Sequence, residues 1–395
     1  MTTEPEATKL TEDERDLEED ARVEEGANLL RDRKRLVSFG LILVLGIVAI
    51  YVVFPKIAGF EDSLEKMDEA TWYWIVVAIG FNLAAFGAYV LLFKGVLGGR
   101  IAERVYERLD TRASYQITMA GLAATRIFSA AGVGGIVVTY WALRKAGMER
   151  RRAACRMVAF LALTYVFYLG ALIVFGILLR TGVLPGANPS GGTIVPAAIA
   201  GVVLVVLGLV ALIPGDVERR LAEFSAGYRG HRFAKRMATG PATLATGIRT
   251  AIAYVRHPKR GFAAVAGALG FWAANIGILW ASFEAYGGDV PFGVLVQGFF
   301  VGMAANLIPS PAGGVGSVDA GMIGAFVLFG IPSSIVFPAV LTYRVIAFWL
   351  PIPPGVVAFF QLRKTVTRWE RERQEESVRG SFRRDVHAGA LYFRK

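Results

Sequence analysis

The chain has 395 residues, of which 54% are hydrophobic and 19% are charged, and its formal net charge at pH 7 is +11. This composition is too apolar for a soluble domain and predicts an integral membrane protein. The positive charge does not indicate a nucleic-acid-binding protein, because the basic residues lie between long apolar runs and form no separate basic domain.

The chain begins with a polar segment, residues 1–35, that we expect to be a cytoplasmic tail. It is acidic up to Glu25 and ends with a basic cluster from Arg31 to Arg35. No small-residue cleavage pattern follows the first apolar run, Leu36–Pro55, so this run is expected to remain as a membrane anchor.

Apolar runs long enough to cross a bilayer core, which takes roughly 20 residues, predict six spans. They are Leu36–Pro55, Thr71–Leu97, Cys155–Leu179, Thr193–Pro214, Gly261–Phe283 and Ser333–Leu362. Two further apolar regions, Ala113–Leu143 and Pro291–Phe329, are interrupted by glycines. Each is either a pair of short re-entrant helices or two tilted spans. We therefore expect an all-α polytopic protein with a transmembrane domain at 36–362.

The distribution of lysine and arginine predicts the orientation in the membrane. Four segments expected inside hold 30 basic residues, whereas four segments expected outside hold 3. Cytoplasmic loops carry such an excess, so both termini, including the basic tail 363–395, are expected in the cytoplasm of a plasma-membrane protein. The basic loop 215–260 also contains interleaved apolar residues, which predict an interfacial amphipathic helix that contacts anionic lipid.

The two glycine-broken regions would then open from opposite sides of the membrane. Residues 125–135 can also be aligned with residues 305–315 at an offset of 180 residues, although glycine-rich segments can match by coincidence. Paired elements of opposite orientation are typical of inverted-repeat transporters, whose substrate site lies near the bilayer midplane.

The second broken region carries the most distinctive motif. Proline and glycine interrupt its helix, and such a break is tolerated where it faces protein or a water-filled cavity. Downstream, Trp349, Pro351, Pro353 and Pro354 predict a second helix distortion beside Arg344. The motif comprises Asn306, Pro309, Pro311, Gly313, Gly314, Gly316 and Asp319, followed by Gly330-Ile331-Pro332 and Tyr343-Arg344.

This ordered motif resembles the lysylphosphatidylglycerol synthase transmembrane-domain family of flippase-like membrane proteins, although the family pattern favours glutamate at the position of Asp319. The resemblance implies a transporter that moves an anionic or modified phospholipid, or a polyprenyl-linked lipid, between leaflets. Bifunctional relatives append a soluble synthase domain. Because 33 residues follow Leu362, we expect that activity to be absent.

Charges inside apolar regions are the strongest candidates for substrate binding, because intramembrane ionisable residues are costly. An arginine can hold a phosphate headgroup, and we favour this role for Arg344, although Asp319 and Arg344 can instead form an ion pair that locks the broken helix. The glycines permit either close ligand approach or close helix packing. The candidate substrate-binding residues are Arg126, Gly134, Gly135, Asn306, Pro309, Pro311, Gly313, Gly314, Gly316, Asp319, Tyr343 and Arg344.

Two other classes of function remain open from the sequence. One is an intramembrane enzyme that modifies lipid headgroups with Asp319 as base, and the other is a scaffold that recruits a separate lipid-modifying partner through its basic loop. Cys155 and the three histidines have no metal-ligand spacing, so we expect no metal, cofactor or catalytic constellation. The expected partners are membrane lipids with anionic headgroups.

Overall fold

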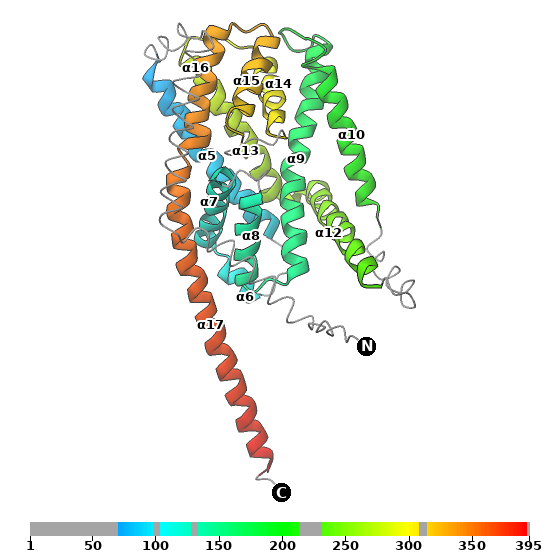
Figure 1. The fold of residues 1–395 in the computed structure, drawn as a ribbon, viewed down its shortest axis with the longest axis vertical. Helices are drawn as coiled ribbons and strands as arrows, with labels where there is room; N and C mark the ends of the chain where they lie inside the picture. Colours follow the sequence, from blue (N-terminus) through cyan, green and yellow to red (C-terminus); the bar gives the residue numbers. More distant parts are fainter. Residues whose placement is uncertain (1–69, 98–102, 128–132, 214–230, 308–313, 393–395) are drawn as a thin grey trace, which may run out of the picture. The chain divides into compact units, whose positions relative to one another are not determined.

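The structure is a computed structural model that describes residues 70–97, 103–127, 133–213, 231–307 and 314–392 (Figure 1). Regular secondary structure in these residues is helical throughout, as the sequence predicts. The predicted tail 1–35 and the predicted first span Leu36–Pro55 lie outside the described residues.

Five helices in the described part of the chain are long and apolar enough to cross a membrane. They correspond to the predicted spans that begin at Thr71, Cys155, Thr193, Gly261 and Ser333, so these five predictions are confirmed. By helix length and composition the protein is a multi-pass membrane protein. The helices are α5 (Trp72–Leu97), α9 (Arg150–Arg180), α10 (Ile194–Ala211), α13 (Pro258–Glu284), and α16 (Ser333–Arg344) continued through the π-helix η5 (Val345–Trp349) into α17 (Ile352–Tyr392).

Helix α10 shows why these helices need a membrane. Its exposed residues include Val202 at 64%, Val205 at 63% and Leu209 at 60% of their full surface, whereas Ala200 and Ala211 are its buried residues. A large apolar face of this kind marks a surface that contacts lipid or another protein and not water.

Helices α5 and α13 pack closely because glycines let their backbones approach. A Cβ atom on Gly95 would lie 2.7 Å from the Cα atom of Ala264, and one on Gly267 would lie 2.6 Å from the Cα atom of Leu92. Small residues provide this kind of contact between membrane helices, where no hydrophobic effect drives association.

Each glycine-broken region is a pair of short helices packed on one another. The helices are α7 (Thr111–Ile127) and α8 (Val133–Lys145) in the first pair, and α14 (Phe292–Met303), the 3-10 helix η4 (Ala304–Leu307) and α15 (Ser317–Leu328) in the second. At about 1.5 Å per residue, the helices of 12 or 13 residues are about 18 to 20 Å long, well below the roughly 30 Å of a bilayer core, whereas α7 with 17 residues is about 26 Å long. The short-helix interpretation therefore fits the second pair and α8 better than full spans.

The predicted alignment of residues 125–135 with residues 305–315 lies partly outside the described residues, which exclude 128–132 and 308–313. In Figure 1 the pair α7 and α8 lies at a different height along α9 from the pair α14 and α15. The inverted repeat itself stays a prediction.

The predicted basic loop 215–260 contains a helix, α12 (His231–Arg256), that belongs to the bundle. Its buried residues Ala242, Ala245, Ile248 and Ala251 recur at helical spacing, and the helix packs against α9. The interleaved apolar residues on which the predicted interfacial helix rests, Leu221, Phe224, Phe233 and Met237, lie in a part of the chain whose side chains the structure does not describe, and the described apolar face of α12 covers protein. Lipid contact by its other face stays a prediction.

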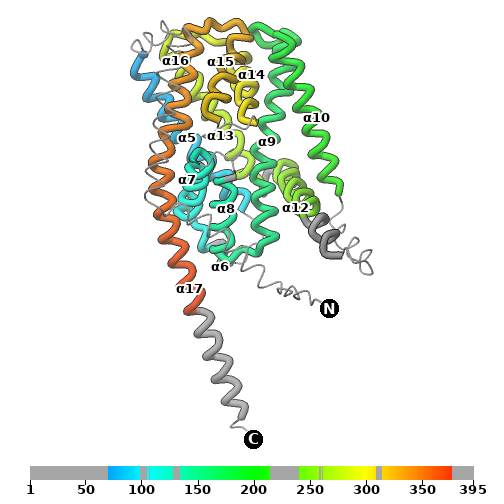
Figure 2. The backbone as a smooth tube through the Cα atoms, in the orientation of Figure 1, coloured from blue at the N-terminus to red at the C-terminus, as the bar shows by residue number. Residues whose placement is uncertain are grey.

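Helix α17 passes α7 and α8 and continues into the predicted basic tail 363–395, of which the structure describes residues up to 392 (Figure 2). Lys145 lies 2.8 Å from Glu370, and the Thr365 hydroxyl donates to Oε1 of Gln116 at 2.8 Å. The short helix α6 (Glu103–Arg108) adds a longer ion pair, at 3.8 Å, from Arg108 to Glu372. These contacts tie the first short-helix pair to α17.

We expect Gly135→Val to destabilise the protein, because a Cβ atom at this position would lie 2.6 Å from the carbonyl oxygen of Gly121 and would also collide with Thr125. Overpacking of this kind costs about 1 to 3 kcal/mol. The melting temperature in detergent should fall by several degrees. The matched control is Gly208→Val in α10, where the added Cβ meets nothing within 4 Å. Equal melting temperatures for the two variants would contradict the packing argument.

Candidate functional site

The site begins with the helix distortion that the sequence predicts beside Arg344, and the structure confirms this distortion as the π-helix η5. Here the Leu350 N–H donates to the carbonyl of Val345, five residues earlier, at 2.9 Å. The carbonyl of Ala347 would need the N–H of residue 351, which is a proline and has none. That carbonyl instead accepts a hydrogen bond from Nη2 of Arg126 at 2.8 Å. Proline chemistry in one element thus creates the acceptor for an arginine 221 residues away.

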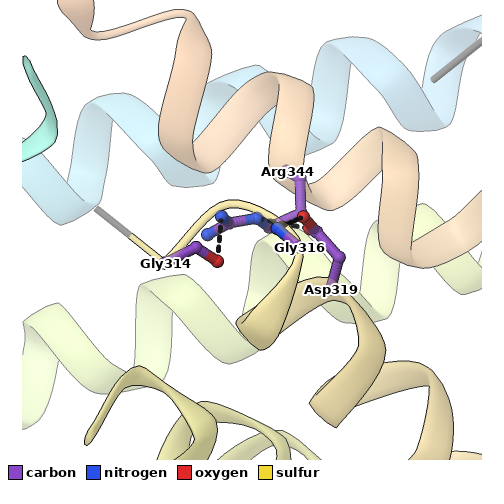
Figure 3. Close-up of polar contacts among 4 residues, drawn as sticks. All are labelled: Gly314, Gly316, Asp319 and Arg344. Carbon is purple, nitrogen blue, oxygen red and sulfur yellow. Dashed lines mark hydrogen bonds and ion pairs between the residues drawn. The ribbon is translucent and has the colours of Figure 1, made fainter. Parts of the chain in front are cut away.

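Arg344 and Asp319 form a buried ion pair (Figure 3). Nε of Arg344 lies 2.6 Å from Oδ1 of Asp319, and the side chains are 5% and 7% exposed. Nη2 of Arg344 also donates to the carbonyl of Gly314 at 3.1 Å, and Oδ2 of Asp319 accepts the N–H of Gly316 at 2.8 Å. The pair therefore joins the end of α16 to the first turn of α15. A carboxylate at this end of a helix also satisfies a free N–H and the helix dipole.

The turn before α15 depends on two of the predicted glycines. Gly314 and Gly316 have φ values of +91° and +86°, in the left-handed region that favours glycine. A Cβ atom on Gly314 would also lie 2.8 Å from Oδ1 of Asn306. Gly314 is therefore explained by the turn and by the close approach of Asn306, without a ligand.

Both arginines lie over the same aromatic ring. The guanidinium carbon of Arg344 is 4.4 Å from the ring centre of Phe348, and that of Arg126 is 5.5 Å from it. Cation–π attraction contributes about 0.5 to 1 kcal/mol at exposed sites and more where water is excluded. The structure thus brings Arg126 and Arg344 to the same aromatic ring.

Arg126 differs from Arg344 because, among the described residues, it has no carboxylate partner and one of its N–H donor groups has no acceptor. Its Nη1 atom is buried and forms no hydrogen bond with any residue that the structure describes. No carboxylate among those residues forms an ion pair with it. Arg126 is close enough to Tyr343, Tyr89 and Arg344 to interact with them electrostatically. Within this described cluster the charges of Arg126, Arg344 and Asp319 leave one net positive charge.

A cavity of about 320 Å³ lies beside this cluster, between α5, α7, α8 and α9. Its wall is largely apolar, and it includes Thr125, the residue before Arg126. At another point of the wall, Nη1 of Arg156 donates to the carbonyl of Val96 at 2.7 Å. The polar lining residues are Tyr89, Thr118, Thr125, Thr139, Arg156 and Tyr165.

The remaining predicted site residues are distributed as follows. Tyr343 is buried, and its hydroxyl donates to Oδ1 of Asn275 at 3.5 Å. Gly135 lines the cavity and is also the packing contact with Gly121, while Gly134 is half-buried in α8. Pro309, Pro311 and Gly313 lie outside the described residues.

Sequence reasoning missed Phe348 and the cavity residues Tyr89, Arg156 and Tyr165. The aromatic residues stand in apolar runs where nothing separates them from lipid-facing neighbours. Arg156 ends a basic segment, residues 144–156, that the sequence predicts to be cytoplasmic. Three-dimensional packing was needed to place them. Among the described residues, no group of three His, Cys, Asp or Glu side chains could hold a metal ion.

Comparison with known proteins places these residues in a wider context. Residues 38–355 match the family described as lysylphosphatidylglycerol synthase TM region. A UPF0104 membrane protein of Methanothermobacter thermautotrophicus is 24% identical over 334 residues, which cover 80% of this chain and 94% of that protein. A second match to a UPF0104 membrane protein of the same organism is 28% identical over 86 residues, or 22% of this chain and 26% of that protein. The family match spans the site from Arg126 to Arg344.

Proposed function

Because the chain belongs to the lysylphosphatidylglycerol synthase TM region family, we propose that it is a flippase-like transporter. It moves a lipid with an anionic phosphate headgroup, either a phospholipid or a polyprenyl-linked lipid, between the leaflets of the plasma membrane. Both termini are cytoplasmic in this proposal.

The observation that carries the proposal is the incompletely satisfied guanidinium of Arg126 within a bundle of span-length helices. A charge at the membrane centre costs about 2.5 to 3.5 kcal/mol on insertion scales, so such residues generally serve a substrate or ion pathway. Guanidinium groups bind phosphate through paired N–H donors, and the net positive charge of the cluster favours an anion.

The two arginines have different roles in this proposal. Arg344 is occupied by Asp319 and Gly314, so it holds the broken helix in place. Arg126 has a donor to spare and receives the headgroup. The sequence had favoured Arg344 for headgroup binding, and the hydrogen bonds now favour Arg126.

The proposal is tested with purified protein in liposomes that contain a fluorescent phosphatidylglycerol or a fluorescent polyprenyl phosphate. Dithionite added outside destroys the fluorescence of the outer leaflet. We expect the protected fraction to fall below one half in vesicles with active protein, because lipid from the inner leaflet becomes accessible. Vesicles with heat-denatured protein should keep about half of their fluorescence. If both lipids stay protected with active protein, the proposed function is wrong.

A further inference from the structure

The cavity between α5, α7, α8 and α9 has the features of a lipid-binding site in its own right. Nothing in the predicted motif pointed to it. We propose that it binds the phosphate group and the adjoining apolar part of a lipid that enters sideways from the bilayer, before the phosphate reaches Arg126. The movement of the phosphate from the cavity to Arg126 rests on the proposed function. The binding of lipid in the cavity can be measured separately.

The opening of the cavity supports lateral access. Two lining residues are substantially exposed, namely Ile136 at 40% on α8 and Tyr165 at 46% on α9. Helices α8 and α9 are neighbours, and from these two exposed residues we infer that the cavity opens between them. Helix α9 is one of the span-length helices, so in this proposal the opening faces lipid.

The polar groups at one end of the cavity fit a phosphate. The phenols of Tyr89 and Tyr165 are near enough to interact electrostatically, and neither hydroxyl donates to a residue that the structure describes. Tyr89 also lies within electrostatic range of Arg126. Two phenol donors beside an arginine can hold a phosphate through hydrogen bonds from O–H and N–H groups to its oxygens.

The rest of the cavity fits the apolar part of the same molecule. Arg156 and Tyr165 are nine positions apart on α9, which corresponds to about 13 Å along the helix. Met157 and Phe160 lie between these levels on α9, and Phe93 and Leu122 add further apolar wall from α5 and α7. A volume of about 320 Å³ is near the lower end of the range for small-molecule sites, so it accommodates the phosphate and the first part of a lipid chain.

The binding test uses the full-length protein in detergent and two probes, dioctanoyl phosphatidylglycerol and a short-chain polyprenyl phosphate. We expect the dissociation constant of at least one probe to rise about tenfold in the double variant Tyr89→Phe/Tyr165→Phe, which removes two hydroxyl donors and leaves the rings. Tyr115→Phe is the matched control, because Tyr115 is an exposed phenol on α7 that does not line the cavity, and its affinity should equal that of the wild type.

A second variant tests the opening. Ile136→Trp should obstruct it and abolish binding, whereas Val202→Trp on the exposed face of α10 should not. The probe whose affinity falls in these variants shows whether the cavity binds a phospholipid or a polyprenyl-linked lipid. Unchanged affinities for both probes in the double phenylalanine variant and in Ile136→Trp would overturn the assignment, as would the absence of binding to the wild type. Normal binding without any flipping would instead contradict the proposed function and leave the cavity assignment standing.

Discussion

The variant Asp319→Asn is expected to melt well below the wild-type protein, because it leaves the buried guanidinium of Arg344 without its countercharge. The two side chains are 7% and 5% exposed, and the carboxylate also accepts the N–H of Gly316. Removing one partner of a buried ion pair typically costs about 3 to 5 kcal/mol. The measurement is the melting temperature in detergent. The matched control is Asp289→Asn, since Asp289 is exposed and forms no ion pair with a described residue.

A double-mutant cycle separates the ion pair from its surroundings. Arg344→Met should also lower the melting temperature, because it leaves the carboxylate of Asp319 buried without a cation. The melting temperature of the combined variant Asp319→Asn/Arg344→Met should fall by less than the sum of the falls in the two single variants. Replacing a whole buried pair is much less costly than removing one of its partners. If either single variant melts like the wild type, the pair does not lock α15 to α16.

The variant Arg126→Gln is expected to show the opposite pattern, with transport lost and stability kept. Arg126 is a half-buried cation whose Nη1 atom is buried, it has no ion-pair partner among the described residues, and it lies near a second cation, Arg344. Removing the charge relieves the cost of an unpaired cation but loses the hydrogen bond to the carbonyl of Ala347, so the two effects oppose each other and the melting temperature should change little. The loss of charge-assisted hydrogen bonds to a phosphate, at about 1.5 to 3 kcal/mol, should slow flipping by roughly 10- to 100-fold.

Two further variants sharpen this test. Arg126→Lys should be intermediate, because lysine keeps the charge but lacks the planar fork that matches a phosphate. Arg112→Gln changes an exposed arginine on the same helix and should flip lipid like the wild type. An equal loss of melting temperature and flipping in Arg126→Gln would indicate a structural role for Arg126.

The sequence could predict the features that depend on local chemistry. The five described spans follow from the length of their apolar runs. The π-helix follows from Pro351, which cannot supply an N–H, and the turn before α15 follows from Gly314 and Gly316. The ion pair of Asp319 and Arg344 was one of two readings of the motif, and burial with direct contact now supports it.

The features that depend on packing between distant segments could not be predicted. The bond from Arg126 to the carbonyl of Ala347 requires α7 to lie beside η5, and no local pattern encodes that contact. The contact of Phe348 with both arginines has the same origin. Tyr89 and Tyr165 are ordinary aromatic residues of apolar helices until the four helices around the cavity are assembled.

The most direct test of the account compares the flipping of an anionic lipid and a zwitterionic lipid by wild-type protein and Arg126→Gln. Fluorescent phosphatidylglycerol and phosphatidylcholine are measured in matched vesicles with the dithionite assay. We predict that wild-type protein flips phosphatidylglycerol faster than phosphatidylcholine, and that this preference disappears in Arg126→Gln while the melting temperature is maintained. A preference for the anionic lipid that persists unchanged in a stable Arg126→Gln protein would contradict the assignment of Arg126 as the headgroup-binding residue.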